Sequence, residues 1–438
     1  MNKQRLRLLM MLGLMGSLLA EPRTQALAAT RDLDPTMQPP AKLASTQGKI
    51  CTTKRVSPQT VTVAPSGENI FRASSRPIIS AKGRLIAYES SAETNPEDNF
   101  WFSSIVVVAE PSSGKTEQVD VNNQGKPANN ISQLADMTLD GRYVAFTSYA
   151  TNLVNGAPQG SLFIRDRLHH VTELVPLADN LRLGLLVDPR VSLSADGRYV
   201  AFGNLDIANV YVYDRVQQTT ELVSLEPGNP SRYSLAPNIS ADGRYVTFTS
   251  GLYGQDANNV FVRDRTTGVT ELVSIGLDGQ PAEGTRPVIS ANGQYIAFVS
   301  SANNLVEGDT NKADDVFVRD QVQKVTERVS VSSTGQQANG FSFDPAITPG
   351  GHYVTFRSEA TNLVAGDTNR VEDVFVRYLK PKITERVSVS STGQQANGAS
   401  SQPTASFRSP TVAFTSDATN LVAEDTNSVS DVFIRICQ

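Results

Sequence analysis

The hydrophobic residues of the chain gather in short β-branched and aromatic runs separated by Gly, Asn, Asp and Pro. Residues 295–300 read Tyr-Ile-Ala-Phe-Val-Ser, and residues 316–320 read Val-Phe-Val-Arg-Asp. Runs of this length and composition are typical of β-strands. No stretch of ten or more residues free of Gly and Pro carries the 3.6-residue spacing of an amphipathic helix. The pattern therefore predicts an all-β chain.

One pattern of strands and turns recurs seven times. Residues 194–202 read Ser-Ala-Asp-Gly-Arg-Tyr-Val-Ala-Phe, and a degenerate copy at residues 406–414 retains Val-Ala-Phe. The Asp-Gly pair marks a tight hairpin, because both central positions of the favoured two-residue turn need a positive φ. This repetition indicates one structural unit that is repeated seven times along the chain. The turn position falls at residues 83, 141, 197, 243, 293, 351 and 409.

Each unit contains four predicted strands, which in the fifth unit span residues 286–290, 295–300, 316–320 and 326–330. Four-stranded units at this period predict a seven-bladed β-propeller. A β-solenoid or a string of sandwiches is the alternative. Solenoid coils are shorter than these units, and sandwiches need Greek-key connections where this chain has hairpins.

The two ends of the repeat region complement each other. The seventh unit ends with its third strand at residues 432–436, and its missing fourth strand should read Thr-Glu-Arg-Val-Ser. Residues 53–57 read Thr-Lys-Arg-Val-Ser. We therefore expect the N-terminal strand to complete the last blade, which removes an open sheet edge.

The two cysteines fit this closure. Aligned on the fifth unit, Cys437 falls at the level of Gln321 and Cys51 at the level of Lys324. The ends of a four-residue turn lie within about 7 Å of each other, and a disulfide needs Cα atoms about 4.4–6.8 Å apart. The alignment predicts a Cys51–Cys437 disulfide. Two free thiols or an intermolecular bridge are the alternatives.

The N-terminus has the layout of a secretory signal peptide. Lys3, Arg5 and Arg7 precede an apolar run at residues 8–20, and Ala-Leu-Ala follows at residues 26–28. This apolar run is short for a membrane-spanning helix, so cleavage is expected rather than an uncleaved anchor. We expect an exported chain, periplasmic or extracellular, whose mature form does not insert into a membrane.

The expected domain organisation follows from these boundaries. Residues 1–28 form the signal peptide. Residues 29–50 carry several Pro, Ser, Thr and Gln residues without apolar periodicity and are expected to be a flexible linker. Residues 51–438 form the propeller.

Composition limits the classes of function. A net charge of −5 gives no electrostatic reason to expect nucleic acid. Three histidines in the whole chain argue against His-rich metal sites and against catalysis. A single tryptophan, Trp101, argues against an extended sugar-stacking surface.

Two of the four connections in each unit are tight turns, and the two longer ones share one face, which we call the long-loop face. Binding residues concentrate on loops held by a rigid scaffold, so this face is the functional candidate. The predicted first strands of the blades line the channel and carry polar residues beside their prolines. These residues are candidates for binding a polar ligand, or they form a water-filled channel wall: Arg76, Asp188, Arg190, Asn238, Arg286 and Asp344.

A Gly-Asp-Thr-Asn-x-x-x-Asp string in the fifth unit, with close copies in the next two, supplies the metal candidates. Alternating oxygen-bearing side chains suit Ca²⁺. Alternatively these Asp and Asn side chains bond their own turn backbone and no cofactor is held. The candidates are Asp309, Asn311, Asp315, Asp367, Asn369, Asp373, Asp425, Asn427 and Asp431.

The unit Pro-x-Ile-Ser-Ala-Asp-Gly-Arg-Tyr-Val-Ala-Phe, which ends in Asp-Val-Phe-Val-Arg-Asp, resembles the TolB-type propeller repeat over residues 51–438. That family includes periplasmic scaffold proteins, peptidase propeller domains and a few lyases. The resemblance implies a β-propeller, and fold alone does not decide among these functions.

We therefore expect an exported, monomeric interaction module that binds a protein or peptide partner on the long-loop face. The alternative is a channel-centred enzyme such as a polysaccharide lyase, which would use Arg and Asp residues of the first strands.

Overall fold

The computed structural model describes residues 50–58, 62–63, 69–70, 72–94, 101–176, 191–204, 209–225, 232–252, 258–407 and 411–437. The expected signal peptide and all but the last residue of the expected linker lie outside these ranges. Inside them, no helix has the length and hydrophobicity needed to cross a bilayer.

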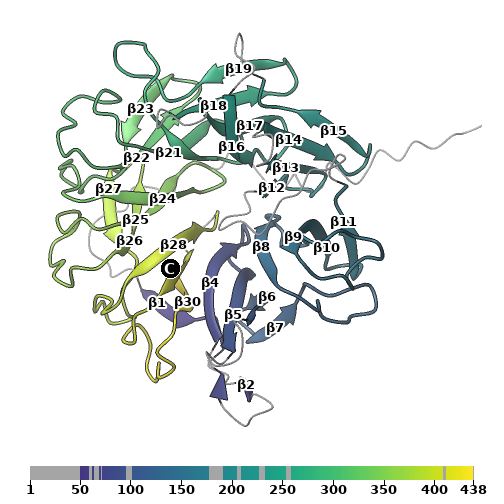
Figure 1. Cartoon of the computed structure of the whole chain (residues 1–438). Helices are drawn as coiled ribbons and strands as arrows, with labels where there is room; N and C mark the ends of the chain where they lie inside the picture. The colour runs from purple at the N-terminus through teal and green to yellow at the C-terminus, as the bar shows by residue number, and fades with distance from the viewer. Residues whose placement is uncertain are drawn as a thin grey trace, which may run out of the picture. The chain divides into compact units, whose positions relative to one another are not determined.

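Seven four-stranded antiparallel sheets form the blades of a β-propeller, as predicted (Figure 1). We number the blades in chain order. The first contains β4 (Arg72–Ile79), β5 (Ile86–Thr94), β6 (Trp101–Glu110) and β7 (Lys115–Gln118); the second β8 (Ser132–Met137), β9 (Tyr143–Ser148), β10 (Ser161–Asp166) and β11 (Val171–Leu174); the third β12 (Val191–Leu193), β13 (Tyr199–Asn204), β14 (Asn209–Asp214) and β15 (Thr219–Leu222); the fourth β16 (Arg232–Ile239), β17 (Tyr245–Leu252), β18 (Asn258–Asp264) and β19 (Val269–Leu272).

The remaining blades follow the same order. The fifth contains β20 (Thr285–Ile289), β21 (Tyr295–Ser300), β22 (Asp315–Asp320) and β23 (Val325–Arg328); the sixth β24 (Ser342–Ile347), β25 (Tyr353–Ser358), β26 (Asp373–Tyr378) and β27 (Ile383–Arg386); the seventh β28 (Ser400–Ala405), β29 (Thr411–Ser416), β30 (Asp431–Cys437) and β1 (Cys51–Arg55). Strands β2 (Thr62–Val63) and β3 (Asn69–Ile70) pair in a separate two-stranded sheet, and β3 contacts β5 of the first blade.

The N-terminal strand closes the ring. Strand β1 pairs antiparallel with β30 in the seventh blade, with Thr53 opposite Arg435. This is the register of Thr326 opposite Arg319 in the fifth blade. Cys51 and Cys437 lie opposite each other and form a disulfide, so both the closure and the disulfide predicted from the repeat are confirmed.

Apolar layers between adjacent blades make up the core. In the second, fifth, sixth and seventh blades, the second and third strands each contribute a fully buried phenylalanine, and the two rings stack at 5.8 Å for Phe298 and Phe317. Valines of the fifth blade, such as Val316, pack against Phe356 of the sixth. Each blade thus buries its faces against both neighbours, which is why the repeat needs a complete ring.

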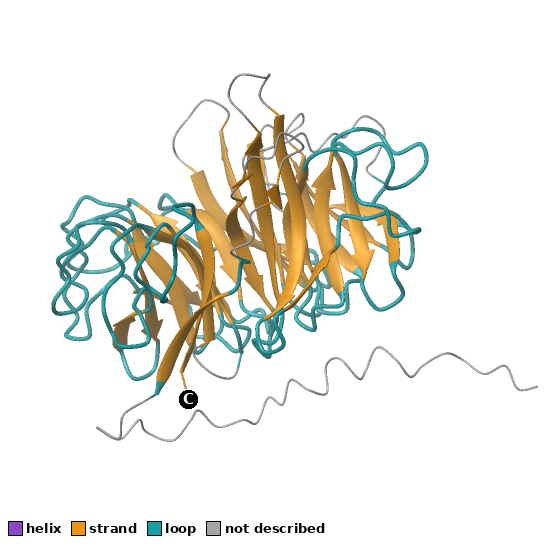
Figure 2. Ribbon diagram, turned by 90° about the horizontal axis from the view of Figure 1, so that it is seen from below, coloured by secondary structure: helices purple, strands orange, loops and turns teal. Residues whose placement is uncertain are grey.

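The hairpin glycine of one blade lies against the preceding blade. Gly243 has a φ of +74°, and a Cβ there would meet Tyr199 at 2.2 Å. Backbone hydrogen bonds between successive hairpins add to this contact, for example from Ala195 N to the Ala241 carbonyl at 2.9 Å. We call this end of the ring the tight-turn face; Figure 2 shows the strands running between loops at the two ends.

Candidate functional site

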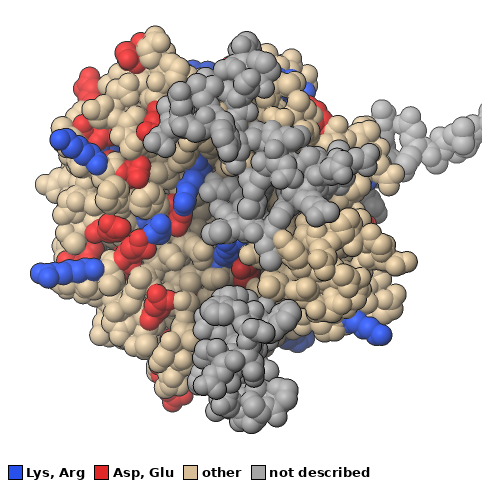
Figure 3. Space-filling view, in the orientation of Figure 1, with Lys and Arg blue, Asp and Glu red and all other residues tan. Residues whose placement is uncertain are grey.

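The first strands of the seven blades surround the central channel, because each contacts the first strand of both neighbours. At the long-loop end of this channel lies a cavity of about 520 Å³, which we call the channel mouth. Figure 3 shows basic and acidic side chains next to one another beside the centre of the ring. The cavity is lined by Arg76, Pro77, Ile78, Leu134, Ala135, Val191, Ala236, Pro237, Asn238, Arg286, Pro287, Val288, Asp344, Pro345, Gln402 and Pro403.

A β-bulge turns the residue before proline in five of the first strands. The pairing register with the second strand shifts at this point in each of them. Proline has no N–H to donate to a sheet, so inside a strand it is confined to edges and bulges. The turned residues have positive φ: Arg76 (54°), Ala236 (57°), Arg286 (52°), Asp344 (51°) and Gln402 (52°).

These five residues hold a strained backbone. A left-handed φ at a residue with a Cβ costs about 1–3 kcal/mol and persists only where the surrounding structure imposes it. Such strain clusters at binding and catalytic sites. Here the five strained residues lie at one level of the channel and surround one cavity. The bulges therefore make the channel mouth the candidate functional site.

A chain of charged side chains links the fifth and sixth blades at the channel mouth. Arg286 Nη1 donates to Asp344 Oδ1 at 2.6 Å, and Arg357 Nε donates to Asp344 Oδ2 at 2.7 Å. Arg357 also forms an ion pair with Glu372 and lies over the ring of Phe343 at 4.9 Å. Positive and negative charges thus alternate along this part of the rim.

Arg357 acts as the anchor of this chain. Burial alone lowers the pKa of its guanidinium, but Asp344 and Glu372 outweigh that effect and the pKa is raised. Arg357 therefore remains charged. Its side chain is 21% exposed, whereas that of Arg286 is 45% exposed. Arg286 is available to a ligand, and Arg357 positions the carboxylate between them.

A second polar cluster joins the seventh, first and second blades. Gln402 Oε1 accepts a hydrogen bond from the backbone N–H of Arg76 at 2.9 Å. The Arg76 guanidinium lies 3.5 Å from Glu89 Oε1, and the same oxygen accepts the N–H of Leu134 at 2.9 Å. The strained residues of adjacent blades are therefore connected through side chains rather than standing alone.

Asn238 and Asp136 connect neighbouring blades. Asn238 Oδ1 accepts the Ile289 N–H at 2.8 Å, and its Nδ2 donates to Ser192 Oγ at 3.2 Å. Asp136 Oδ2 accepts the Leu193 N–H at 2.7 Å deeper in the channel. Burial raises the pKa of Asp136 to about 6, although hydrogen bonds from Leu193 and Met137 oppose the shift. Both side chains hold the scaffold together.

The structure brings together four of the six side chains proposed for the channel. Arg76, Asn238, Arg286 and Asp344 line the channel mouth. Asp188 and Arg190 lie outside the described residues. Sequence reasoning missed Gln402, although Gln402-Pro403 repeats the polar-residue–proline signal. It also missed Arg357, Glu89 and Glu372, which lie outside the first strands and reach the site only through sheet register and blade packing.

The acidic loops of the last three blades are engaged by arginine. Arg328 Nη1 contacts Asp309 Oδ1 and Asp315 Oδ2, each at 3.1 Å. Asn311 Nδ2 donates to Asp315 Oδ2 at 2.8 Å. The arrangement recurs in the next two blades, with Arg386 among Asp367, Asn369 and Asp373, and Arg55 among Asp425, Asn427 and Asp431.

These ion pairs with arginine balance the negative charge of the loop carboxylates, and no metal ion takes part in them. Arg328 and Asp315 are almost fully buried, so the ion pair belongs to the scaffold. Within the described ranges, no group of three or more His, Cys, Asp or Glu residues is placed to hold a metal ion. The calcium hypothesis therefore stays a prediction, and a Ca²⁺ ion would have to compete with a buried guanidinium.

Solved structures of similar fold support the propeller. No protein-family model and no curated protein matches the chain. Oligogalacturonate lyase from Vibrio parahaemolyticus superposes with a TM-score of 0.52 at 11% identity, over 88% of this chain and 97% of that one. The β-propeller domain of the Trilobed protease from Pyrococcus furiosus gives 0.51 at 10% identity, over 83% and 95%.

A TolB structure is also among the similar proteins. TolB from Acinetobacter baumannii gives a TM-score of 0.42 at 16% identity, over 70% of this chain. The match covers 64% of that TolB chain, so it spans less than two thirds of its length. At these identities the similarities show the β-propeller fold alone. The function must be argued from the channel mouth.

Proposed function

We propose that this chain is an exported interaction module that holds a peptide segment of a protein partner in the channel mouth on the long-loop face. The ring of five strained residues carries the proposal, because four of the five are charged or polar and all five line one cavity. A rigid scaffold that maintains strain at one place supplies a preorganised binding site.

The chemistry of the channel mouth suits a peptide. Its rim presents both guanidinium and carboxylate groups, and proline rings form much of its wall. A polypeptide backbone offers donors and acceptors to both kinds of group, whereas a uniformly acidic ligand would meet Asp344 and Glu372 unfavourably. A cavity of about 520 Å³ accommodates a few residues.

Export is supported by two independent observations. The Cys51–Cys437 disulfide joins the ends of the propeller, and disulfides of this kind persist in oxidising compartments. The sequence carries the layout of a signal peptide before the propeller. The partner would then be met in the periplasm or outside the cell.

The experiment uses a library of linear peptides displayed on phage. The expected result is enrichment of a sequence family on the oxidised chain that is lost on Asp344→Ala. Asp278→Ala, at an exposed turn residue outside the channel, serves as the control and should retain the enrichment. Enrichment that persists on Asp344→Ala, or none at all, would refute the proposal.

A polysaccharide lyase is the second candidate, because Arg76 and Arg286 line the channel mouth and Arg357 contacts Asp344 beside it. Arg286 and Arg357 share Asp344, and Arg76 lies beside Glu89, so each is close to a carboxylate. No histidine or cysteine is among the described residues that line the cavity. Incubation with oligogalacturonate, with and without manganese, distinguishes the candidates: unsaturated products would favour the lyase.

A further inference from the structure

Arginines fill the gaps between blades at three places near the tight-turn face. Arg167, Arg215 and Arg265 follow the third strands of the second, third and fourth blades. Each donates from Nη1 to the carbonyl of its own hairpin glycine at 2.6–2.7 Å. Each also pairs with a glutamate on the fourth strand of the preceding blade; these glutamates are Glu117, Glu173 and Glu221.

A tyrosine of the preceding blade completes the arginine site in two of these gaps. The Arg215 guanidinium lies over the Tyr143 ring at 4.6 Å, and that of Arg265 lies over Tyr199 at 4.5 Å. A cation over an aromatic face gains electrostatic energy, more so where water is excluded. The chain thus builds a guanidinium receptor from an aromatic face, a glycine carbonyl and a carboxylate.

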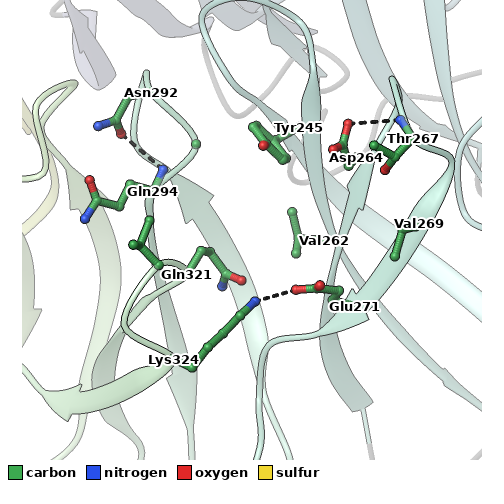
Figure 4. Close-up of a pocket in the computed structure, with 12 residues that line it drawn as sticks. Tyr245, Val262, Asp264, Thr267, Val269, Glu271, Asn292, Gln294, Gln321 and Lys324 are labelled. Atoms are coloured by element: carbon green, nitrogen blue, oxygen red, sulfur yellow. Dashed lines mark hydrogen bonds and ion pairs between the residues drawn. The ribbon is translucent and has the colours of Figure 1, made fainter. Parts of the chain in front are cut away.

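The fifth blade keeps the receptor and lacks the arginine. Gln321 occupies the arginine position, and Tyr245, Glu271 and Gly293 occupy the receptor positions (Figure 4). A cavity of about 480 Å³ lies among them, which we call the fifth-blade slot. The side-chain amide nitrogen of Gln321, Nε2, is buried and has no hydrogen-bond partner.

The next two gaps are closed in other ways. Leu379 holds the arginine position in the sixth blade, where it packs in the same apolar cluster as Tyr295. Cys437 holds it in the seventh blade and is bonded to Cys51. Among the gaps at the second to seventh blades, and within the described residues, the gap at the fifth blade is the one that combines an aromatic and acidic receptor with a short polar residue that leaves it open.

We propose that the fifth-blade slot binds an arginine side chain presented by a partner protein. The guanidinium lies over Tyr245 and donates to the Gly293 carbonyl and the Glu271 carboxylate, as the chain's own arginines do elsewhere. Val269 and Val322, which are 51% and 75% exposed, line the slot and contact the methylene stem. This site is on the tight-turn face and does not depend on the proposed function of the channel mouth.

Two charged groups at the slot decide how tightly it binds. Lys324 Nζ donates to Glu271 at 2.6 Å, and both side chains are 51% exposed. An exposed pair of this kind is weak, so an incoming guanidinium can take over the carboxylate. Asp264 also lines the slot but is held by Arg244 at 2.7 Å, and that arginine lies over Tyr245 at 4.7 Å.

The test is a nuclear magnetic resonance titration of the oxidised chain that follows the Gly293 amide. The probes are an acetylated, amidated Gly-Gly-Arg-Gly-Gly peptide, its lysine counterpart and free arginine. We expect saturable binding of the arginine peptide with a Kd on the order of 1 mM. Glu271→Gln should weaken it about tenfold, because a charge-assisted hydrogen bond is lost.

Gln321→Arg is the decisive variant, since it places the chain's own guanidinium in the slot. It should abolish binding and raise the melting temperature, which also shows that the variant folds. Gln217→Arg adds the same charge at an exposed turn of the third blade and should leave binding unchanged. Binding that persists in Gln321→Arg, equal binding of the lysine peptide, or no binding would overturn the proposal. Tighter binding of free arginine than of the peptide would overturn the assignment to a partner protein.

Discussion

Arg286 of the fifth blade donates a hydrogen bond from Nη1 to Asp344 Oδ1 of the sixth blade at 2.6 Å. Both residues precede a proline, and both have a positive φ, 52° and 51°. Two equivalent bulges in neighbouring blades therefore turn oppositely charged side chains toward each other. Their side chains are 45% and 23% exposed, so the pair adds little to stability. The cost of holding the strained backbone is better explained by a binding role.

Removing the disulfide should lower the stability of the closed ring. Cys51→Ser combined with Cys437→Ser removes the covalent bond between β1 and β30, so that strand pairing alone holds the seventh blade closed. Because the bond closes a loop of sequence separation 386, the loss of unfolding free energy is about 6 kcal/mol at most in the chain-entropy model. Urea unfolding of the variant checks this, and reduced wild-type protein should behave in the same way. An unchanged unfolding midpoint in both would contradict the closure account.

Gly243→Ala should destabilise the chain by about 2–4 kcal/mol. A methyl group there would meet Tyr199 at 2.2 Å, and the φ of +74° is unfavourable for alanine. Gly279→Ala is the matched control, because its φ is +77° but no atom lies within 4 Å of the added Cβ. The control should lose about 1 kcal/mol. If the two variants lost equal stability in thermal unfolding, the contact between Gly243 and Tyr199 would contribute nothing to the stability of the chain.

The buried carboxyl of Asp136 should make stability fall as the pH rises. Its pKa is raised to about 6 in the folded chain, against about 3.9 when unfolded. The folded state therefore binds more protons between about pH 4 and 6, and its free energy of unfolding decreases across that window by about 2–3 kcal/mol at most. Chemical unfolding from pH 4 to 7 checks this. The free energy of unfolding of Asp136→Asn should increase relative to that of wild type as the pH rises. A difference independent of pH would disprove the assignment.

Asp315→Asn should destabilise the fifth blade by about 1.5–3 kcal/mol, because it removes one of the two carboxylates that pair with the buried Arg328 and leaves only Asp309. Asp278→Asn, at an exposed turn, should cost almost nothing. Millimolar Ca²⁺ should not raise the melting temperature of wild type if arginine already compensates these loops. A rise with Ca²⁺ that Asp309→Asn removes would instead support the calcium hypothesis.

The repeat made the ring and its closure predictable. Because seven copies share one register, aligning Cys51 with Lys324 and Cys437 with Gln321 was enough to place the cysteines opposite each other. The hydrophobic pattern and the hairpin glycines indicate local structure, and every copy of the repeat carries the same indications. The propeller fold could therefore be predicted from this one sequence, without comparison to a homologue.

The candidate site was only half predictable. Prolines marked the first strands, but the positive φ of Arg76 or Gln402 follows from bulge geometry, which residue identity does not reveal. Arg357 comes from a second strand and reaches Asp344 through cross-strand register. The arginine contacts of the acidic loops could not be predicted for the same reason: Arg328 lies on the fourth strand, and only pairing of β22 with β23 brings it to Asp315.

The most direct test of the central claim is the affinity of a library-selected peptide for the oxidised chain and for its Arg286→Ala variant, measured by calorimetry. Arg142→Ala is the matched control, since Arg142 forms an equivalent pair with Asp166 on the tight-turn face. We expect Arg286→Ala to weaken binding at least about tenfold, as loss of a charge-assisted hydrogen bond does, and Arg142→Ala to leave it unchanged. Equal affinity for wild type and Arg286→Ala would show that the channel mouth is not the binding site.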